Sequence, residues 1–96
     1  MEIKFSPTAE LTLNQNISYI SNDKPDIALK IADTIHKAID ELVSNYKIYP
    51  KIGKNFQQML LYKKLRFRVL FSVNLVNQKI IIHAVLNTRQ NISSLL

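Results

Sequence analysis

Two long β-strand patterns near the end of the sequence constrain the fold more than any other feature of the chain. Residues 66–73 and 79–89 are rich in aliphatic, β-branched and aromatic side chains, and a short turn separates them. Because successive side chains of a strand point to opposite faces, Arg66 and Arg68 must share one face of a sheet while Phe67 lies on the other. The two segments therefore predict a sheet with one apolar face and one cationic face, which is suited to an anionic partner.

A tight turn centred on residues 76–77 would pair these segments as a hairpin. Every pair on one face is then apolar, as a correct register requires, because a slip of one residue would turn the whole set outward. The apolar pairs are Val73 with Ile80, Phe71 with Ile82, Val69 with Ala84 and Phe67 with Leu86. The same register places Arg68 opposite Val85 and Arg66 opposite Asn87. The polar cluster expected on the cationic face comprises Arg66, Arg68, His83, Asn87 and, if the strand extends, Arg89.

The charge of the chain is unevenly distributed. Its formal net charge is +6 at pH 7, and no acidic residue follows Glu41. The cations that follow Glu41 are Lys47, Lys51, Lys54, Lys63, Lys64, Arg66, Arg68, Lys79 and Arg89. Such an excess indicates affinity for nucleic acid, an anionic surface or an acidic partner.

Composition excludes several classes of protein. The chain has no cysteine and two histidines far apart in sequence, so disulfides and a dedicated metal site are not expected, and no cofactor is predicted. No apolar run approaches the roughly 20 residues that cross a bilayer, and the first residues lack the apolar stretch of a signal peptide. A single soluble domain spanning residues 1–96, located in the cytoplasm and not in a membrane, is expected.

The rest of the sequence predicts a short strand, then two helices, then another strand before the two long ones. Residues 2–5 form a short strand, and Ser6 and Pro7 are a typical N-cap and first residue of a helix that would end near Ser21. A second helix begins at Pro25 and continues as an apolar stripe: Ile27, Ile31, Ile35, Ala38, Ile39, Leu42 and Tyr46. Residues 47–55 are expected to be a loop and residues 57–63 a strand. The predicted fold is α+β, with an antiparallel helix hairpin on a largely antiparallel sheet that ends in a three-stranded meander.

Five short motifs in this order resemble the RelE/ParE toxin superfamily of bacterial type II toxin–antitoxin systems. They are residues 5–9 at the strand-to-helix junction, residues 25–28 at the second helix start, the set Leu42, Pro50 and Gly53, residues 67–71, and residues 85–89. Two departures concern chemistry. The family often has histidine where Asn87 stands, and often a basic residue where this chain has Gln57 and Gln58. Both changes remove groups that could serve acid–base or phosphate chemistry.

The resemblance is closer to the ParE branch, whose members are known as inhibitors of DNA gyrase. It implies a toxin that binds gyrase and is neutralised by a cognate acidic antitoxin, with which it could form a hetero-oligomer. The residues expected to bind the target or its phosphates are Arg66, Arg68, Asn87, Arg89, Lys63 and Lys64. The antitoxin could add a strand to the sheet or lay a helix in a groove, and the sequence does not choose between these modes.

Two alternatives remain open. Some RelE-type toxins are metal-independent endoribonucleases that cut mRNA on the ribosome, and for that activity the candidate catalytic residues are Arg68, His83 and Arg89. His83 would be the proton carrier, because no carboxylate follows Glu41 and no tyrosine follows Tyr62. The other alternative is an inactive relative whose basic face serves only its antitoxin. The scarcity of proton carriers favours a binding toxin over a nuclease.

Overall fold

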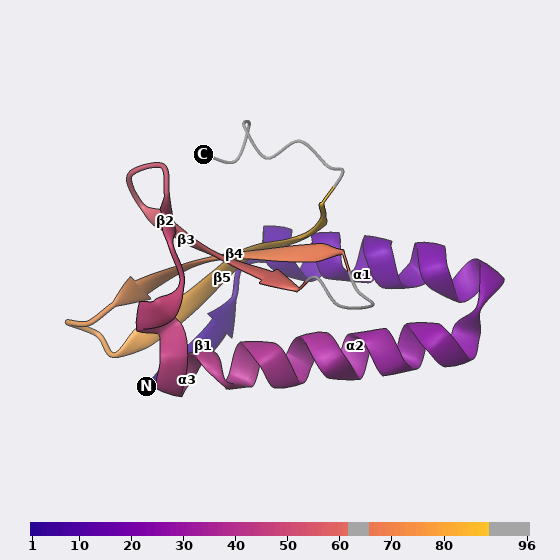
Figure 1. Ribbon diagram of the computed structural model, residues 1–96, viewed down its shortest axis with the longest axis horizontal. Coiled ribbons are helices and arrows are strands. Elements are labelled where there is room, and N and C mark those ends of the chain that lie inside the picture. The colour runs from indigo at the N-terminus through magenta and orange to yellow at the C-terminus, as the bar shows by residue number, and fades with distance from the viewer. Residues whose placement is uncertain (62–65, 89–96) are drawn as a thin grey trace.

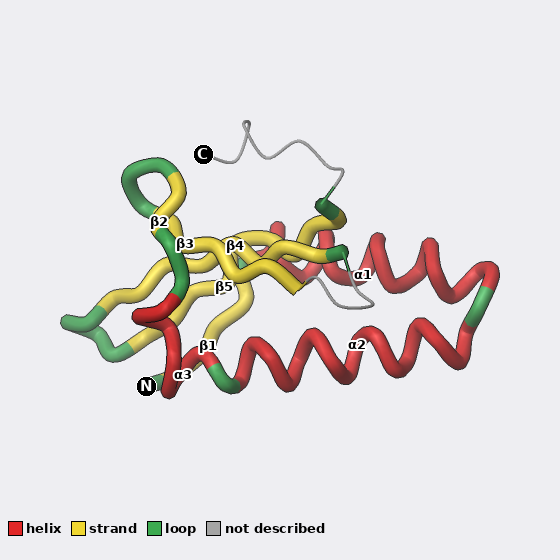
Figure 2. The backbone as a smooth tube through the Cα atoms, viewed as in Figure 1, coloured by secondary structure: helices red, strands yellow, loops and turns green. Residues whose placement is uncertain are grey.

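The computed structural model describes residues 1–61 and 66–88 and has the α+β fold that the sequence predicts. The elements are β1 (Glu2–Phe5), α1 (Pro7–Asp23), α2 (Pro25–Asp40), α3 (Leu42–Asn45), the 3₁₀ turn η1 (Tyr46–Ile48), β2 (Lys51–Ile52), β3 (Phe56–Leu61), β4 (Phe67–Asn74) and β5 (Lys79–Asn87). Figure 1 shows the hairpin of α1 and α2 extending beyond the sheet. Figure 2 distinguishes the helices from the strands by colour. None of the helices in the described ranges is long and apolar enough to cross a membrane.

The sheet has five strands in the order β1-β5-β4-β3-β2. β1 runs parallel to β5 and the other neighbours are antiparallel, so β3, β4 and β5 form the predicted meander. β2 is an addition, because Lys51 and Ile52 of the expected loop pair with Gln57 and Phe56. Two residues are too few to show a strand period in a sequence. Gly53, with a φ of 65°, lets the chain reverse between the two strands.

The helices begin where the sequence predicts. The side chain of Ser6 accepts a hydrogen bond from the Ala9 amide at 3.0 Å, which satisfies one free amide of α1. α1 then continues to Asp23 rather than ending near Ser21. The predicted second helix is interrupted at Glu41, so α2 and α3 are separate. The Ser44 amide bonds to the Glu41 carbonyl at 3.0 Å, an i−3 contact that tightens the backbone and turns the chain.

The core lies between the helices and one face of the sheet, here called the covered face. Its buried residues come from the helices and the sheet: Ala9, Leu13, Ile35, Ile39, Leu42, Met59, Phe67, Val69, Phe71, Ile80, Ile82 and Val85. Phe67 and Phe71 are the largest of these side chains, and Phe71 is fully buried. Burial of one such side chain stabilises a fold by roughly 1.5–3 kcal/mol.

Helix α1 completes one edge of β5 with its side chains. β1 pairs with β5 only as far as Ile82. Beyond that point the Val85 amide donates to Oγ1 of Thr12 at 3.0 Å, and Nδ2 of Asn16 donates to the Val85 carbonyl at 3.2 Å. Oγ of Ser6 donates to the His83 carbonyl at 3.1 Å. Three side chains therefore take the place of a neighbouring strand.

A β-bulge in the β4–β5 hairpin corrects the predicted register. Near the turn the pairs agree with the prediction, since Val73 faces Ile80 and Phe71 faces Ile82. The register then shifts by one residue, and His83 is the extra residue on β5. The prediction is wrong beyond this point. The observed pairs there are Leu70 with Ala84, Val69 with Val85, Arg68 with Leu86 and Phe67 with Asn87.

Candidate functional site

The candidate site lies on the far face, which is the sheet face opposite the covered face. β4 places Arg68 and Ser72 there, because Val69 and Phe71 alternate with them and lie in the core. β3 contributes Phe56 and β5 contributes His83, which contact each other across the sheet. The site thus draws on three strands, and the hairpin of β4 and β5 supplies its polar groups.

Arg68 is partly buried and is held by the end of the neighbouring strand. Its Nη2 donates to the Thr88 carbonyl at 2.7 Å. Its Nε is buried and has no hydrogen-bond partner among the described residues. A guanidinium has five N–H donors, so this contact orients the side chain and leaves other donors for a ligand. The fork geometry of arginine suits carboxylate and phosphate groups.

His83 is held in the bulge by two neighbours. Its Nε2 lies 2.7 Å from Oγ of Ser72, and either atom can be the donor depending on the tautomer. Its ring meets the ring of Phe56 edge-on, with centroids 4.7 Å apart. Burial lowers the pKa of His83 below its ordinary value of 6.5, because the imidazolium loses solvation. The imidazole is therefore neutral at neutral pH.

Apolar residues occupy the middle of the far face. Leu70, Ala84 and Leu86 are buried there, and Ile52 of β2 packs against them. The pair of Leu70 and Ala84 lies between Arg68 and His83 along the hairpin. The prediction of a continuous polar cluster is wrong in this respect, since the bulge turns Ala84 and Leu86 onto the face that was expected to be cationic.

Of the other predicted site residues, the two that the structure describes, Arg66 and Asn87, do not join Arg68 and His83 in one cluster. Arg66 is exposed just before β4, and its carbonyl accepts the Thr88 amide at 2.8 Å, so it does not face Asn87. Asn87 pairs with Phe67 of the core and so belongs to the covered face, because opposed residues share a face. Lys63, Lys64 and Arg89 lie outside the described residues.

Sequence reasoning did not identify two residues that contact His83. Ser72 lies four residues after Arg68, and this strand spacing places both on one face, so the register alone could have indicated it. Phe56 was outside the expected strand. Gln57, by contrast, belongs to the covered face, where its Nε2 donates to the carbonyls of Tyr46 at 2.8 Å and Tyr49 at 3.1 Å.

The far face is poor in groups for proton transfer. Its acidic side chain in the described ranges is Glu2, which lies on the edge strand 3.9 Å from Nζ of Lys4. The same ranges contain no cluster of three or more His, Cys, Asp or Glu residues that could hold a metal ion. What the arrangement offers is one oriented arginine and one neutral histidine, with buried apolar side chains between them.

One of the comparisons with known proteins identifies a family. Residues 3–92 match the family model described as "ParE toxin of type II toxin-antitoxin system, parDE". A solved structure titled "Chromosomal ParDE TA system from P. aeruginosa" superposes with a TM-score of 0.79 and 18% sequence identity, over 93% of this chain and 97% of that one. A search of the curated proteins gave no match. The structural likeness shows the fold, and the family match extends over most of the sequence.

Proposed function

Since the chain belongs to the ParE toxin family of type II toxin–antitoxin systems, we propose that it inhibits growth by binding DNA gyrase through the far face. A toxin of this type has an antitoxin partner, and the cationic second half of the chain favours an acidic one. The resemblance to the ParE branch supports gyrase as the target. The far-face contacts support binding over cleavage.

The orientation of Arg68 carries this proposal. The guanidinium is held by the Thr88 carbonyl at 2.7 Å and lies beside the buried pair of Leu70 and Leu86. Arginine and aromatic side chains surrounded by apolar contacts are typical of the residues that dominate protein–protein binding. A side chain that is already oriented also loses less conformational entropy when a partner binds.

Cleavage of mRNA is the second candidate, and His83 is the observation that favours it. A neutral imidazole can accept the proton of a 2′-hydroxyl. Its Nε2, however, is already bonded to Ser72, and the ring packs against Phe56. A nuclease would have to break the Ser72 contact before His83 could act through that nitrogen.

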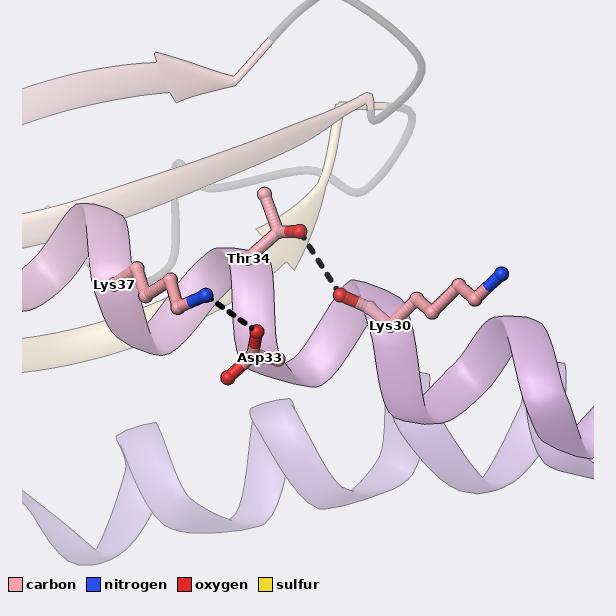
Figure 3. A network of polar contacts seen from close by, with 4 residues as sticks. All are labelled: Lys30, Asp33, Thr34 and Lys37. Carbon is pink, nitrogen blue, oxygen red and sulfur yellow. Dashed lines mark hydrogen bonds and ion pairs between the residues drawn. The ribbon is translucent and has the colours of Figure 1, made fainter.

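Two assays on the purified protein separate these functions. Inhibition of gyrase supercoiling and cleavage of ribosome-bound mRNA would be measured for the wild type, Arg68→Ala and Lys30→Ala. Lys30 is a matched control, because it is an exposed cation on α2. Figure 3 shows it outside the ion pair between Lys37 and Asp33, whose charged atoms lie 3.0 Å apart. Circular dichroism would confirm that each variant is folded.

We expect the wild type to inhibit supercoiling and Arg68→Ala to require at least about tenfold more protein, which corresponds to about 1.4 kcal/mol of binding free energy. Lys30→Ala should inhibit like the wild type. Ribosome-dependent cleavage with no effect on gyrase would establish the nuclease instead. No effect in either assay would indicate an inactive relative that only binds its antitoxin.

A further inference from the structure

The outer edge of β1 carries backbone groups beside which no strand of the described residues lies. β1 is the last strand of the sheet, and nothing in residues 1–61 or 66–88 pairs with its outer side. The Glu2 amide donates to the Gln78 carbonyl at 2.9 Å and the Ser6 amide donates to the Ile82 carbonyl at 2.9 Å. In a parallel ladder alternate residues of a strand bond to the neighbour. The N–H and C=O groups of Ile3 and Phe5 therefore point away from β5.

We propose that the outer edge of β1 pairs with β1 of a second copy of the chain, antiparallel, so that the two sheets become continuous. Ile3 lies opposite Ile3 of the partner at the twofold axis. Phe5 lies opposite Met1 of the partner, and Glu2 lies opposite the partner's Lys4. Such an interface is isologous, because the same strand serves both subunits. The proposal does not depend on the toxin's target.

Side-chain chemistry selects this register over its neighbour. Glu2 and Lys4 lie on the far face with 60% and 51% of their side chains exposed, so both are available to a partner. With Ile3 opposite Ile3, each Glu2 faces a lysine and each Lys4 faces a glutamate. A shift that placed Ile3 opposite Phe5 would set Lys4 against Lys4, and directly opposed like charges destabilise a strand pair. On the covered face the opposed residues are apolar in the proposed register.

The charges also favour a second copy over another occupant. An extended segment of an acidic antitoxin would bring its charge against Glu2 as well as Lys4. In a second copy of β1, by contrast, each Glu2 meets a lysine and each Lys4 meets a glutamate. The strand has four residues, and an interface of that size is typical of weak association. The dimer should therefore form in equilibrium with the monomer and depend on protein concentration.

Charge exchange tests the proposal without altering the core. Sedimentation velocity across a concentration series would compare the wild type with Glu2→Lys, Lys4→Glu and the double variant, each without added residues before Met1. Each single change opposes like charges and should raise the dimer dissociation constant at least about tenfold. The double variant restores opposite charges and should associate like the wild type. Lys30→Glu on α2 is the matched control for Lys4→Glu and should not affect association.

Mixing the two single variants gives the sharpest result. Glu2→Lys carries two cations on β1 and Lys4→Glu carries two anions, so an equimolar mixture should form dimers that neither variant forms alone. Amide hydrogen exchange at Ile3 should slow as the wild type dimerises. A wild type that stays monomeric, or single variants that associate like it, would overturn the proposal. Protection of the Ile3 amide only when a co-expressed antitoxin is present would assign this edge to the antitoxin instead.

Discussion

Replacement of Thr12 by valine tests how α1 completes the edge of β5. The Val85 amide donates to Oγ1 of Thr12 at 3.0 Å, and Val85 is fully buried. Valine keeps the volume of threonine but removes this acceptor, so the buried amide loses its hydrogen bond to Thr12. A buried donor left unsatisfied costs about 1–3 kcal/mol. We therefore expect the free energy of unfolding to fall by about this amount, and the melting temperature by about 4–8 °C for each kcal/mol.

Thr34→Val provides the matched control. Thr34 is exposed on α2, and its Oγ1 donates to the Lys30 carbonyl at 2.9 Å (Figure 3). Oγ1 of Thr12 donates in the same way to the Thr8 carbonyl at 2.8 Å. Both changes remove a hydroxyl bond to the carbonyl four residues earlier, so their difference reports mainly the bond to Val85. Thr34→Val should shift stability by less than about 0.5 kcal/mol.

Urea unfolding followed by circular dichroism measures both variants, and amide exchange at Val85 reports the bond directly. That amide should exchange faster in Thr12→Val than in Thr34→Val. Equal stability of the two variants would show that α1 does not complete the strand in this way.

Two further predictions concern the core and the bulge. Phe71→Ala should destabilise the protein by about 3–5 kcal/mol in urea unfolding, because Phe71 is fully buried, whereas Val76→Ala at the turn, where the side chain is 93% exposed, should leave stability nearly unchanged. Burial lowers the pKa of His83, so the unfolded chain binds a proton more readily than the folded chain. The contribution of His83 to the free energy of unfolding is therefore fully present above the ordinary pKa of 6.5, and it is lost as the pH falls towards the pKa of the folded state. Urea unfolding between pH 5 and pH 8 should therefore show a smaller decrease towards low pH in His83→Gln, and identical slopes would contradict the assignment.

The order of the elements could be predicted because local patterns determine it. Ser6 and Pro7 specify the start of α1, and the apolar stripe specifies α2. The register beside the turn was also predictable, since Val73 and Phe71 must face the core. In each case a periodic or capping signal lies within a few neighbouring residues, where sequence reasoning is strongest.

The features that escaped prediction depend on contacts between distant segments. Nothing near His83 in the sequence marks a bulge, because the shift arises where β1 ends and α1 takes over the edge of β5. Asn16 and Thr12 bind the Val85 peptide from 69 and 73 residues away. The interruption at Glu41 is similar, since the apolar stripe continues across it and neither proline nor glycine marks it in the sequence.

The bulge decides what kind of surface the far face is. Without the extra residue, Asn87 would lie beside Arg68, and Val85 would leave the core. With it, Val85 is buried on the covered face, and Ala84 and Leu86 replace polar groups around Arg68. A surface that holds a phosphate backbone draws its affinity from several cations around the bound phosphates, whereas the immediate neighbours of Arg68 on this face are apolar, an environment typical of protein–protein contacts. The packing demand of the core therefore makes the described part of this face better suited to a protein partner than to RNA.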